Sequence, residues 1–148
     1  MKHSTILFVI VLFIAFNSTA QAQKKSTMAK MPSTKIISAV DVEEEIDGQS
    51  ARVSTVEVTL QPKAESMPHR HPGPVYGYVL EGTYEFKVEG QPLRTLHPGD
   101  TFYEPLMALH EVGTNPSSNS ITRVLAIVTH PRSAKNLVIL EKAMEMAE

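Results

Sequence analysis

The residues best suited to chemistry are three histidines, two of which lie one position apart. His69 and His71 form a His-x-His pair, and His110 follows further along the chain. Residues i and i+2 of a β-strand face the same side, so both imidazoles can bind one ion at about 2.0–2.1 Å. The chain has no cysteine, so a metal must be held by histidine nitrogens and oxygen atoms. The pair indicates a metal site, although Pro68 and Pro72 beside it also suit an exposed loop.

Short strand patterns separated by turns must position these histidines. Alternating or β-branched segments occupy residues 35–42, 51–60, 75–80, 83–88, 93–96, 101–104, 110–114 and 121–128. Many short strands without a helical pattern between them are typical of an antiparallel sandwich or barrel. The tail, residues 137–147, contains good helix formers and predicts a helix packed on the barrel or across a dimer.

The residues around the histidines resemble the two sequence motifs of the cupin superfamily, over about residues 53–128. The matching motif residues are His69, His71 and Gly82 in the first motif and Gly99, Pro105 and His110 in the second. The resemblance implies an all-β fold, the cupin double-stranded β-helix or jelly-roll barrel, here followed by the C-terminal helix. It also implies a metal-binding cavity inside the barrel.

Several motif positions depart from the family pattern. Val75 stands where the family usually has its carboxylate ligand, and a shift by one position gives Tyr76. The other altered positions are two glycines replaced by Lys63 and Met107, and an asparagine replaced by Thr114, with Asn115 one step late. The ligand set that the resemblance leaves is His69, His71 and His110.

Three neutral imidazoles hold a divalent ion without cancelling its charge, which leaves the ion electrophilic and open to substrate. The predicted cofactor is a divalent metal ion, Fe, Cu, Ni, Zn or Mn, with Mn retained least because no carboxylate is assigned. Some three-histidine members of the superfamily are ferrous oxygenases, which favours a metal-dependent, dioxygenase-like oxidoreductase acting on a small organic compound. Two alternatives remain: a cupin that binds a small molecule without catalysis, and a metal-dependent isomerase or decarboxylase.

Glu104 is the best remaining acid near the second motif. It is the candidate catalytic residue, as a base beside the metal or as a carboxylate that turns toward it; a solvated acid at a strand end is the alternative. Strand parity adds that Gly77 and Val79 face the cavity with Val75. Small and apolar residues there predict a roomy pocket for a partly hydrophobic ligand with one or two oxygen atoms.

The other polar residues near the motifs are given structural or surface roles. His97 lies in a turn and His130 ends the last strand, so both are predicted at the surface. Arg70 is expected to point away from the cavity that its two neighbours face. Tyr103 can line either the pocket or a sheet face.

Composition and the N-terminus bound the partners and the location. The chain carries 14 Lys and Arg against 16 Asp and Glu, and this net charge of −2 excludes a nucleic-acid-binding surface. Apolar residues 6–16 followed by Ala20-Gln21-Ala22 predict a signal peptide, residues 1–22, cleaved after Ala22. The run is shorter than the roughly 20 residues of a membrane span, which predicts a secreted or periplasmic protein without stable membrane insertion.

The predicted organisation of the mature chain is a flexible leader at 23–34, a cupin barrel at 35–130 and a helical tail at 131–148. A homodimer is expected, because such barrels often cover their edge strands by pairing between subunits.

Overall fold

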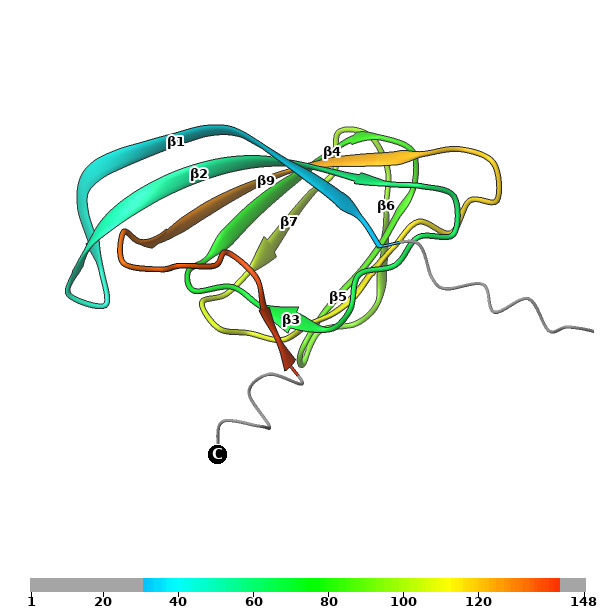
Figure 1. The fold of residues 1–148 in the computed structure, drawn as a ribbon. Helices are drawn as coiled ribbons and strands as arrows, with labels where there is room; N and C mark the ends of the chain where they lie inside the picture. The colour runs from blue at the N-terminus through cyan, green and yellow to red at the C-terminus, as the bar shows by residue number, and fades with distance from the viewer. Residues whose placement is uncertain (1–30, 142–148) are drawn as a thin grey trace, which may run out of the picture.

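The computed structural model describes residues 31–141, where ten β-strands form two antiparallel sheets (Figure 1). The first sheet has the order β1-β2-β9-β4-β7, formed by Ser33–Ile46, Gln49–Leu60, Thr122–Pro131, Val75–Glu81 and Thr101–Glu104. The second has the order β10-β3-β8-β5-β6, formed by Ile139–Leu140, His69–Arg70, His110–Thr114, Tyr84–Val88 and Arg94–Leu96. The predicted all-β class is therefore confirmed.

Alternation of side chains along the strands agrees with the sequence pattern. On β4, Val75 and Val79 are fully buried, whereas Tyr76 is 58% exposed. The predicted ranges 101–104 and 110–114 coincide with β7 and β8. Because successive side chains of a strand point to opposite faces, the buried members identify the inner face of each sheet.

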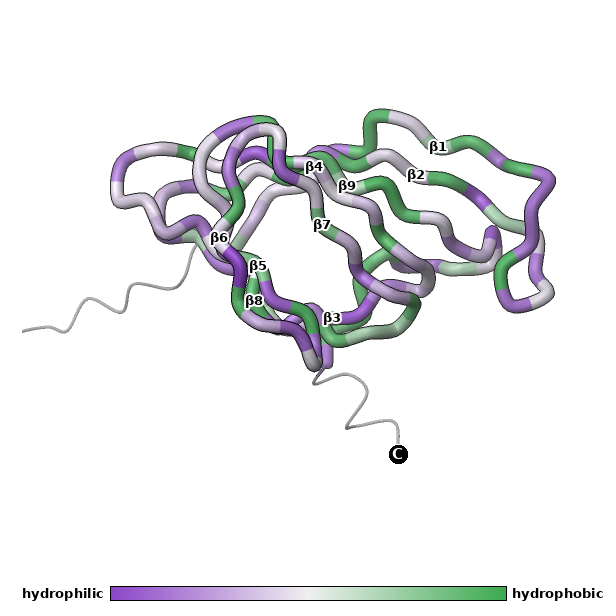
Figure 2. The backbone as a smooth tube through the Cα atoms, turned by 180° about the vertical axis from the view of Figure 1, so that it is seen from behind, coloured by the Kyte–Doolittle hydropathy of each residue, from purple (hydrophilic) through white to green (hydrophobic). Residues whose placement is uncertain are grey.

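Large apolar side chains from both sheets meet between them. The buried cluster consists of Leu60, Ala64, Val79, Tyr84, Phe86, Val88, Leu96, Phe102 and Val124. The rings of Phe86 and Phe102, from opposite sheets, have centroids 4.6 Å apart, a normal distance for an aromatic pair. Figure 2 shows the two layers from behind, with β4 and β9 above and β5, β8 and β3 below. This packed interior supports β7 and β8, which carry two of the candidate site residues.

Two turns keep a backbone shape that glycine usually provides. Lys63 and Met107, which replace motif glycines, have φ angles of 61° and 57°. The Lys63 backbone N–H donates to the Ser117 carbonyl at 3.0 Å, and the Met107 N–H donates to the His71 carbonyl at 3.2 Å. These hydrogen bonds offset the cost of left-handed backbone at residues with a Cβ. The replaced glycines therefore change the residues of these turns without changing their shape.

Asn115 is a fully buried polar residue that joins three segments. Its Nδ2 donates to the carbonyls of Leu60 at 3.1 Å, Gln61 at 3.2 Å and Ser120 at 2.8 Å. Its Oδ1 accepts from the Ser117 backbone N–H at 3.0 Å. Both ends of the amide are thus satisfied, as a buried polar group requires.

In the described part of the segment predicted as a helix, 137–147, residues 137–140 are not helical and only Glu141 has helical backbone. Ile139 pairs with Arg70 and Leu140 pairs with His69, so these residues form strand β10. Strand pairing has overridden local helix propensity, which is a weak preference of well under 1 kcal/mol per residue. Residues 142–147 of the predicted helix lie outside the described residues.

Strand β1 begins at Ser33, inside the predicted flexible leader of residues 23–34. The predicted signal peptide and its cleavage site lie outside the described residues. Within residues 31–141, no helix is long and apolar enough to cross a membrane.

Candidate metal centre

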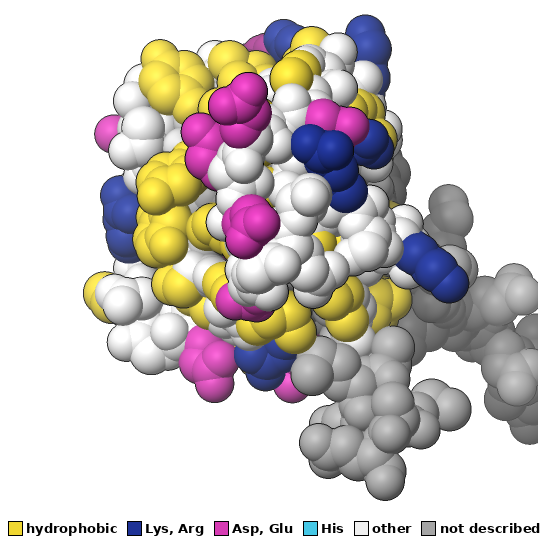
Figure 3. Space-filling view, turned by 90° about the vertical axis from the view of Figure 1, so that its left-hand side faces the viewer, with side chains coloured by type: hydrophobic (Ala, Val, Ile, Leu, Met, Phe, Trp, Pro, Cys, Tyr) yellow, Lys and Arg dark blue, Asp and Glu magenta, His cyan; other side chains and the backbone are white. Residues whose placement is uncertain are grey.

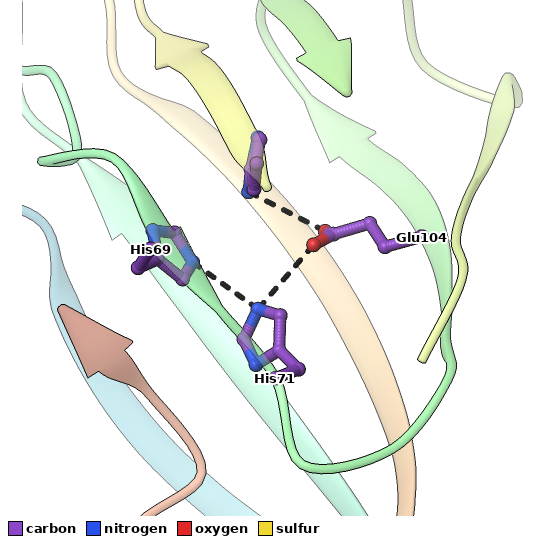
Figure 4. A group of neighbouring side chains, drawn as sticks. His69, His71 and Glu104 are labelled. Atoms are coloured by element: carbon purple, nitrogen blue, oxygen red, sulfur yellow. Dashed lines mark hydrogen bonds and ion pairs between the residues drawn. The ribbon is translucent and has the colours of Figure 1, made fainter. Parts of the chain in front are cut away.

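Four buried side chains converge between the two sheets: His69, His71, Glu104 and His110. His69 on β3 pairs in register with His110, the first residue of β8. His71 directly follows β3, and Glu104 ends β7 in the opposite sheet. One nitrogen or oxygen atom of each lies within 4.8 Å of the others, and Figure 4 shows His69, His71 and Glu104 pointing toward a common space. The structure thus brings together all four residues that the sequence singled out.

Three pairs of the converging atoms are spaced nearly as two ligands of one ion are. The two Nε2 atoms of His69 and His71 are 3.1 Å apart. The Glu104 carboxylate lies 3.4 Å from Nε2 of His71 and 3.5 Å from Nδ1 of His110. Two ligands at about 2.0–2.1 Å from one ion are about 2.9–3.4 Å apart at angles of roughly 90–110°. The observed separations are close to this range.

Each histidine is held by a backbone carbonyl on the ring nitrogen that faces away from the common space. Nδ1 of His69 donates to the Met67 carbonyl at 2.8 Å, and Nδ1 of His71 donates to the Leu137 carbonyl at 2.5 Å. Nε2 of His110 donates to the Val112 carbonyl at 2.8 Å. A carbonyl only accepts, so each of these nitrogens carries the proton and the opposite nitrogen presents a lone pair to the centre. This is the arrangement that orients histidine metal ligands.

Two buried polar atoms of the centre have no hydrogen-bond partner among the described residues. They are Oε2 of Glu104 and Nδ1 of His110. An unpartnered buried donor or acceptor costs about 1–3 kcal/mol, and more if it is charged. A cation between the two sheets would satisfy both atoms, so the donor set fits a divalent metal ion.

Burial shifts the protonation of the centre toward neutral groups. Burial, together with the neighbouring His69, lowers the pKa of His71 to about 4 and that of His110 to about 3. Burial raises the pKa of Glu104 to about 8. Without a metal at neutral pH, the histidines are therefore neutral and Glu104 holds its proton. All three histidines are ready to bind a cation, whereas Glu104 must first release a proton.

Glu104 is 3% exposed, so the interpretation of it as a solvated acid is wrong. Its Cα is the register partner of that of Val75, across the β4–β7 pair. Strand β7, which pairs with β4, therefore supplies a carboxylate beside the position where the motif carboxylate is missing. Sequence spacing identified the acid, but only strand pairing places it among the histidines.

A cavity of about 480 Å³ lies against the four residues. Its apolar wall includes Val56, Val58, Leu60, Val124, Ala126 and Val128 from β2 and β9. The cavity is apolar as expected, but Val75, Gly77 and Val79, which were expected to line it, do not, and the expectation that Gly77 provides room is wrong. A Cβ on Gly77 would lie 1.9 Å from Cζ of Phe102, because that ring already fills the space over the glycine.

Tyr84 is a cavity residue that motif reasoning missed. Its hydroxyl lies 3.5 Å from Nε2 of His110, and burial raises its pKa far above the usual value. Gly113 beside it also lines the cavity, and a Cβ there would lie 2.7 Å from the Tyr84 hydroxyl and 3.0 Å from Cε1 of His110. Tyr84 lies on the buried face of β5, but nothing in the sequence placed it beside His110.

The remaining predictions concern polar residues near the motifs, and one of them, for His130, is wrong. His97 is exposed, as predicted, and Tyr103 is exposed against Tyr76 rather than in the pocket. His130 was expected at the surface but is 4% exposed, and its Nε2 lies 2.9 Å from Oγ of Ser54. The β2–β9 pairing covers it, because Arg52 and His130 are register partners. Arg70 makes its contacts away from the cavity, as predicted.

Comparison with protein families agrees with this geometry. Residues 56–128 match the family model of the cupin domain. The chain belongs to the cupin superfamily. A comparison with curated protein sequences found no match.

Solved cupin structures share its fold at low sequence identity. A double-stranded β-helix protein from Klebsiella pneumoniae is 16% identical with a TM-score of 0.55, covering 75% of this chain and 86% of that one. The DMSP lyase DddQ from Ruegeria pomeroyi is 22% identical with a TM-score of 0.52, covering 62% and 44%. An oxalate oxidase in complex with glycolate is 21% identical with a TM-score of 0.50, covering 60% and 46%. This cupin thus aligns with less than half the length of the lyase and of the oxidase.

Proposed function

We propose that this cupin binds a divalent metal ion through His69, His71, Glu104 and His110 and uses it to act on a small organic molecule. The observation that carries the proposal is the pair of unpartnered buried atoms, Glu104 Oε2 and His110 Nδ1, which face a shared centre with two further lone pairs. A carboxylate in the ligand set also changes the expected metal. Oxygen ligands suit harder ions, so Mn joins Fe, Zn, Cu and Ni as a candidate of equal standing.

In its sharpest form, the function is that of a dioxygenase-like oxidoreductase. A bound ion would supply Lewis acidity and open positions for substrate and oxygen. The chain supplies the apolar wall that excludes water, and the carbonyl-held histidines that keep their orientation. One oxygen of Glu104 suffices as a ligand, which leaves the other as the candidate base for a substrate proton. The substrate class that suits the wall is a small, partly hydrophobic compound with one or two oxygen atoms.

The proposal is tested first by elemental analysis of the purified protein by plasma mass spectrometry. His69→Ala and His110→Ala should each remove metal that the unmodified protein carries near one equivalent. The matched control is His97→Ala, an exposed histidine away from the centre, which should retain the metal. Metal at trace level in the unmodified protein that added ions do not restore would overturn the proposal. Oxygen uptake with small aromatic and 1,3-dicarbonyl compounds then tests the oxidoreductase form.

A non-catalytic binding cupin is the alternative that the cavity also supports. Among the described residues, the cavity lining contains only two ionisable side chains besides the four candidate ligands, Tyr84 and Lys135. Neither is assigned as a catalytic acid or base. A ligand that binds without reacting raises the melting temperature by mass action. Stabilisation by a compound that is recovered unchanged would favour this alternative over the enzyme.

Export and dimerisation complete the proposal. The pattern of residues 1–22 supports export, and N-terminal sequencing of secreted protein tests the cleavage after Ala22. Strand β1 is an edge strand with exposed apolar side chains, including Ile36 at 61% and Val40 at 56%. The face in Figure 3 likewise carries apolar side chains among acidic ones. These features support a homodimer, and light scattering after size-exclusion chromatography tests it.

A further inference from the structure

Arg70 lies between two candidate ligands and makes four contacts away from the cavity. Its Nε donates to Oε2 of Glu141 at 3.0 Å, and its Nη2 donates to Oε1 of Glu141 at 3.1 Å. Its Nη1 donates to the Met107 carbonyl at 2.7 Å and approaches Oε2 of Glu89 at 3.4 Å. The contact with Glu141 is a two-point fork, the stronger geometry for arginine and carboxylate, and the arginine side chain is only 18% exposed.

Glu141 ends a short segment, residues 135–141, that we call the strap. Residues 135–138 and Leu140 of the strap line the cavity. Its strand β10 pairs with β3, and the Glu141 backbone N–H donates to the Pro68 carbonyl at 3.2 Å. The strap therefore lies against the same short strand that carries His69.

The strap also holds the second histidine of the pair. The Leu137 carbonyl accepts the Nδ1 proton of His71 at 2.5 Å, which leaves the Nε2 lone pair directed at the centre. Met67 and Val112, which hold His69 and His110, are each two residues from the histidine they hold, whereas Leu137 is 66 residues from His71. The orientation of His71 thus depends on a remote segment that must stay in place.

We propose that Arg70 and Glu141 are positioning residues of the metal centre. Their forked ion pair keeps the strap on β3, and the strap keeps the Leu137 carbonyl on His71. The inference rests on the proposed metal binding and deepens it. Loss of a partner that orients a metal ligand typically costs about 10–100-fold in metal affinity. The coupling is reciprocal, so metal binding must also stabilise the docked strap.

The attachment of the strap explains why this one ion pair carries the effect. Strand β10 has two residues, and its strand partner is β3. A ladder of that length is marginal without side-chain contacts. Arg70 also holds a second segment at the site. It donates to the Met107 carbonyl, and the Met107 N–H donates to the His71 carbonyl.

The test is a Zn²⁺ titration of the full-length protein against a chromophoric chelator, with Glu141→Gln as the main variant. Glu141→Gln keeps the size of the side chain but loses the charge, and it should weaken Zn²⁺ binding about 10–100-fold. Arg70→Lys keeps the charge but loses the fork, so it should weaken binding in the same direction and by less. The matched control is Glu57→Gln, which breaks the forked pair of Glu57 with Arg123 on the first sheet and should leave Zn²⁺ affinity unchanged.

A structural role alone would lower the melting temperature without changing the site, so a second readout is needed. Mass-spectrometric hydrogen exchange of residues 135–141 should slow when Zn²⁺ is added to the unmodified protein, and less so in Glu141→Gln. The visible spectrum of the Co²⁺-loaded protein should also change in Glu141→Gln and not in Glu57→Gln.

The outcomes separate the two proposals. Unchanged Zn²⁺ affinity and an unchanged Co²⁺ spectrum in Glu141→Gln would overturn the positioning role while leaving the metal site intact. No Zn²⁺ or Co²⁺ binding by the unmodified protein would instead overturn the proposed function itself. If Glu141→Gln does not fold, Arg70→Lys decides the matter by the same readouts.

Discussion

Val75 and Glu104 are register partners on β4 and β7, and both side chains are buried between the sheets. Partners in a strand pair point to the same face, so the carboxylate lies beside the position where the family motif places it. The structure therefore supplies a carboxylate from the neighbouring strand. Four potential metal ligands converge although the sequence motif reads as incomplete.

Moving the carboxylate back across the strand pair should preserve metal binding. Glu104→Val alone is expected to weaken Mn²⁺ binding at least about tenfold, because a hard ion loses its oxygen ligand. The double variant Val75→Glu/Glu104→Val keeps the total side-chain volume and should recover most of that loss. Isothermal titration with Mn²⁺ measures both, and Glu81→Gln, an exposed acid on β4, serves as control. A double variant no better than Glu104→Val would contradict the equivalence of the two positions.

Metal binding at neutral pH should release close to one proton. The pKa of Glu104 is raised to about 8, so its carboxyl group is protonated at pH 7 and must ionise to bind a cation. The histidine pKa values near 4 and 3 mean that His71 and His110 release none. Affinity should therefore rise about tenfold per pH unit up to about pH 8 and then level off. Calorimetry in two buffers of different ionisation enthalpy counts the protons, and Glu104→Gln should reduce the count to nearly zero.

The metal-free protein should be most stable near pH 6.5. Below that pH, unfolded histidines of pKa 6.5 bind protons that folded His71 and His110 do not, so stability rises with pH from about 4 to 6.5. Glu104 acts in the opposite direction: the folded group keeps its proton to about pH 8, whereas the unfolded group loses it near 4.5. Two histidines outweigh one acid below pH 6.5, and only the acid titrates above it.

Urea unfolding in the presence of a chelator at several pH values tests this curve. Glu104→Gln should abolish the fall in stability between pH 6.5 and 8 and keep the rise below 6.5. A difference between the two proteins that stays constant across this range would contradict the assignment.

Asn115→Ala should destabilise the fold by about 2–4 kcal/mol. The change leaves the carbonyls of Leu60, Gln61 and Ser120, of which the Leu60 contact is fully buried, without the amide that satisfies them. Urea unfolding measures the loss, and Asn119→Ala in the same loop is the control, because Asn119 is exposed. A loss below about 1 kcal/mol would mean that other donors replace the amide.

Local pattern predicted the three histidines and eight of the ten described strands, all except the two-residue strands β3 and β10, because alternation and i, i+2 spacing act within a few residues. The features that it missed depend on pairing between distant segments. His130 is buried and contacts Ser54, 76 residues away, and Ile139 and Leu140 form a strand because β3 is there to pair with them. Gly77 suggested open space, but Phe102 on the neighbouring strand fills it. Register and the packing of remote side chains decide such cases, and neither is visible in a local pattern.

The four converging side chains come from two sheets, with Glu104 on one and the histidines on or beside strands of the other. An unfolded chain cannot hold all four around one ion, so the centre exists only after the sheets have closed. Raw affinity alone does not select one divalent metal over another, because the supply of each ion also matters. For the proposed metal site, the ions available in the compartment where the barrel closes would therefore act together with the ligand set in selecting the metal.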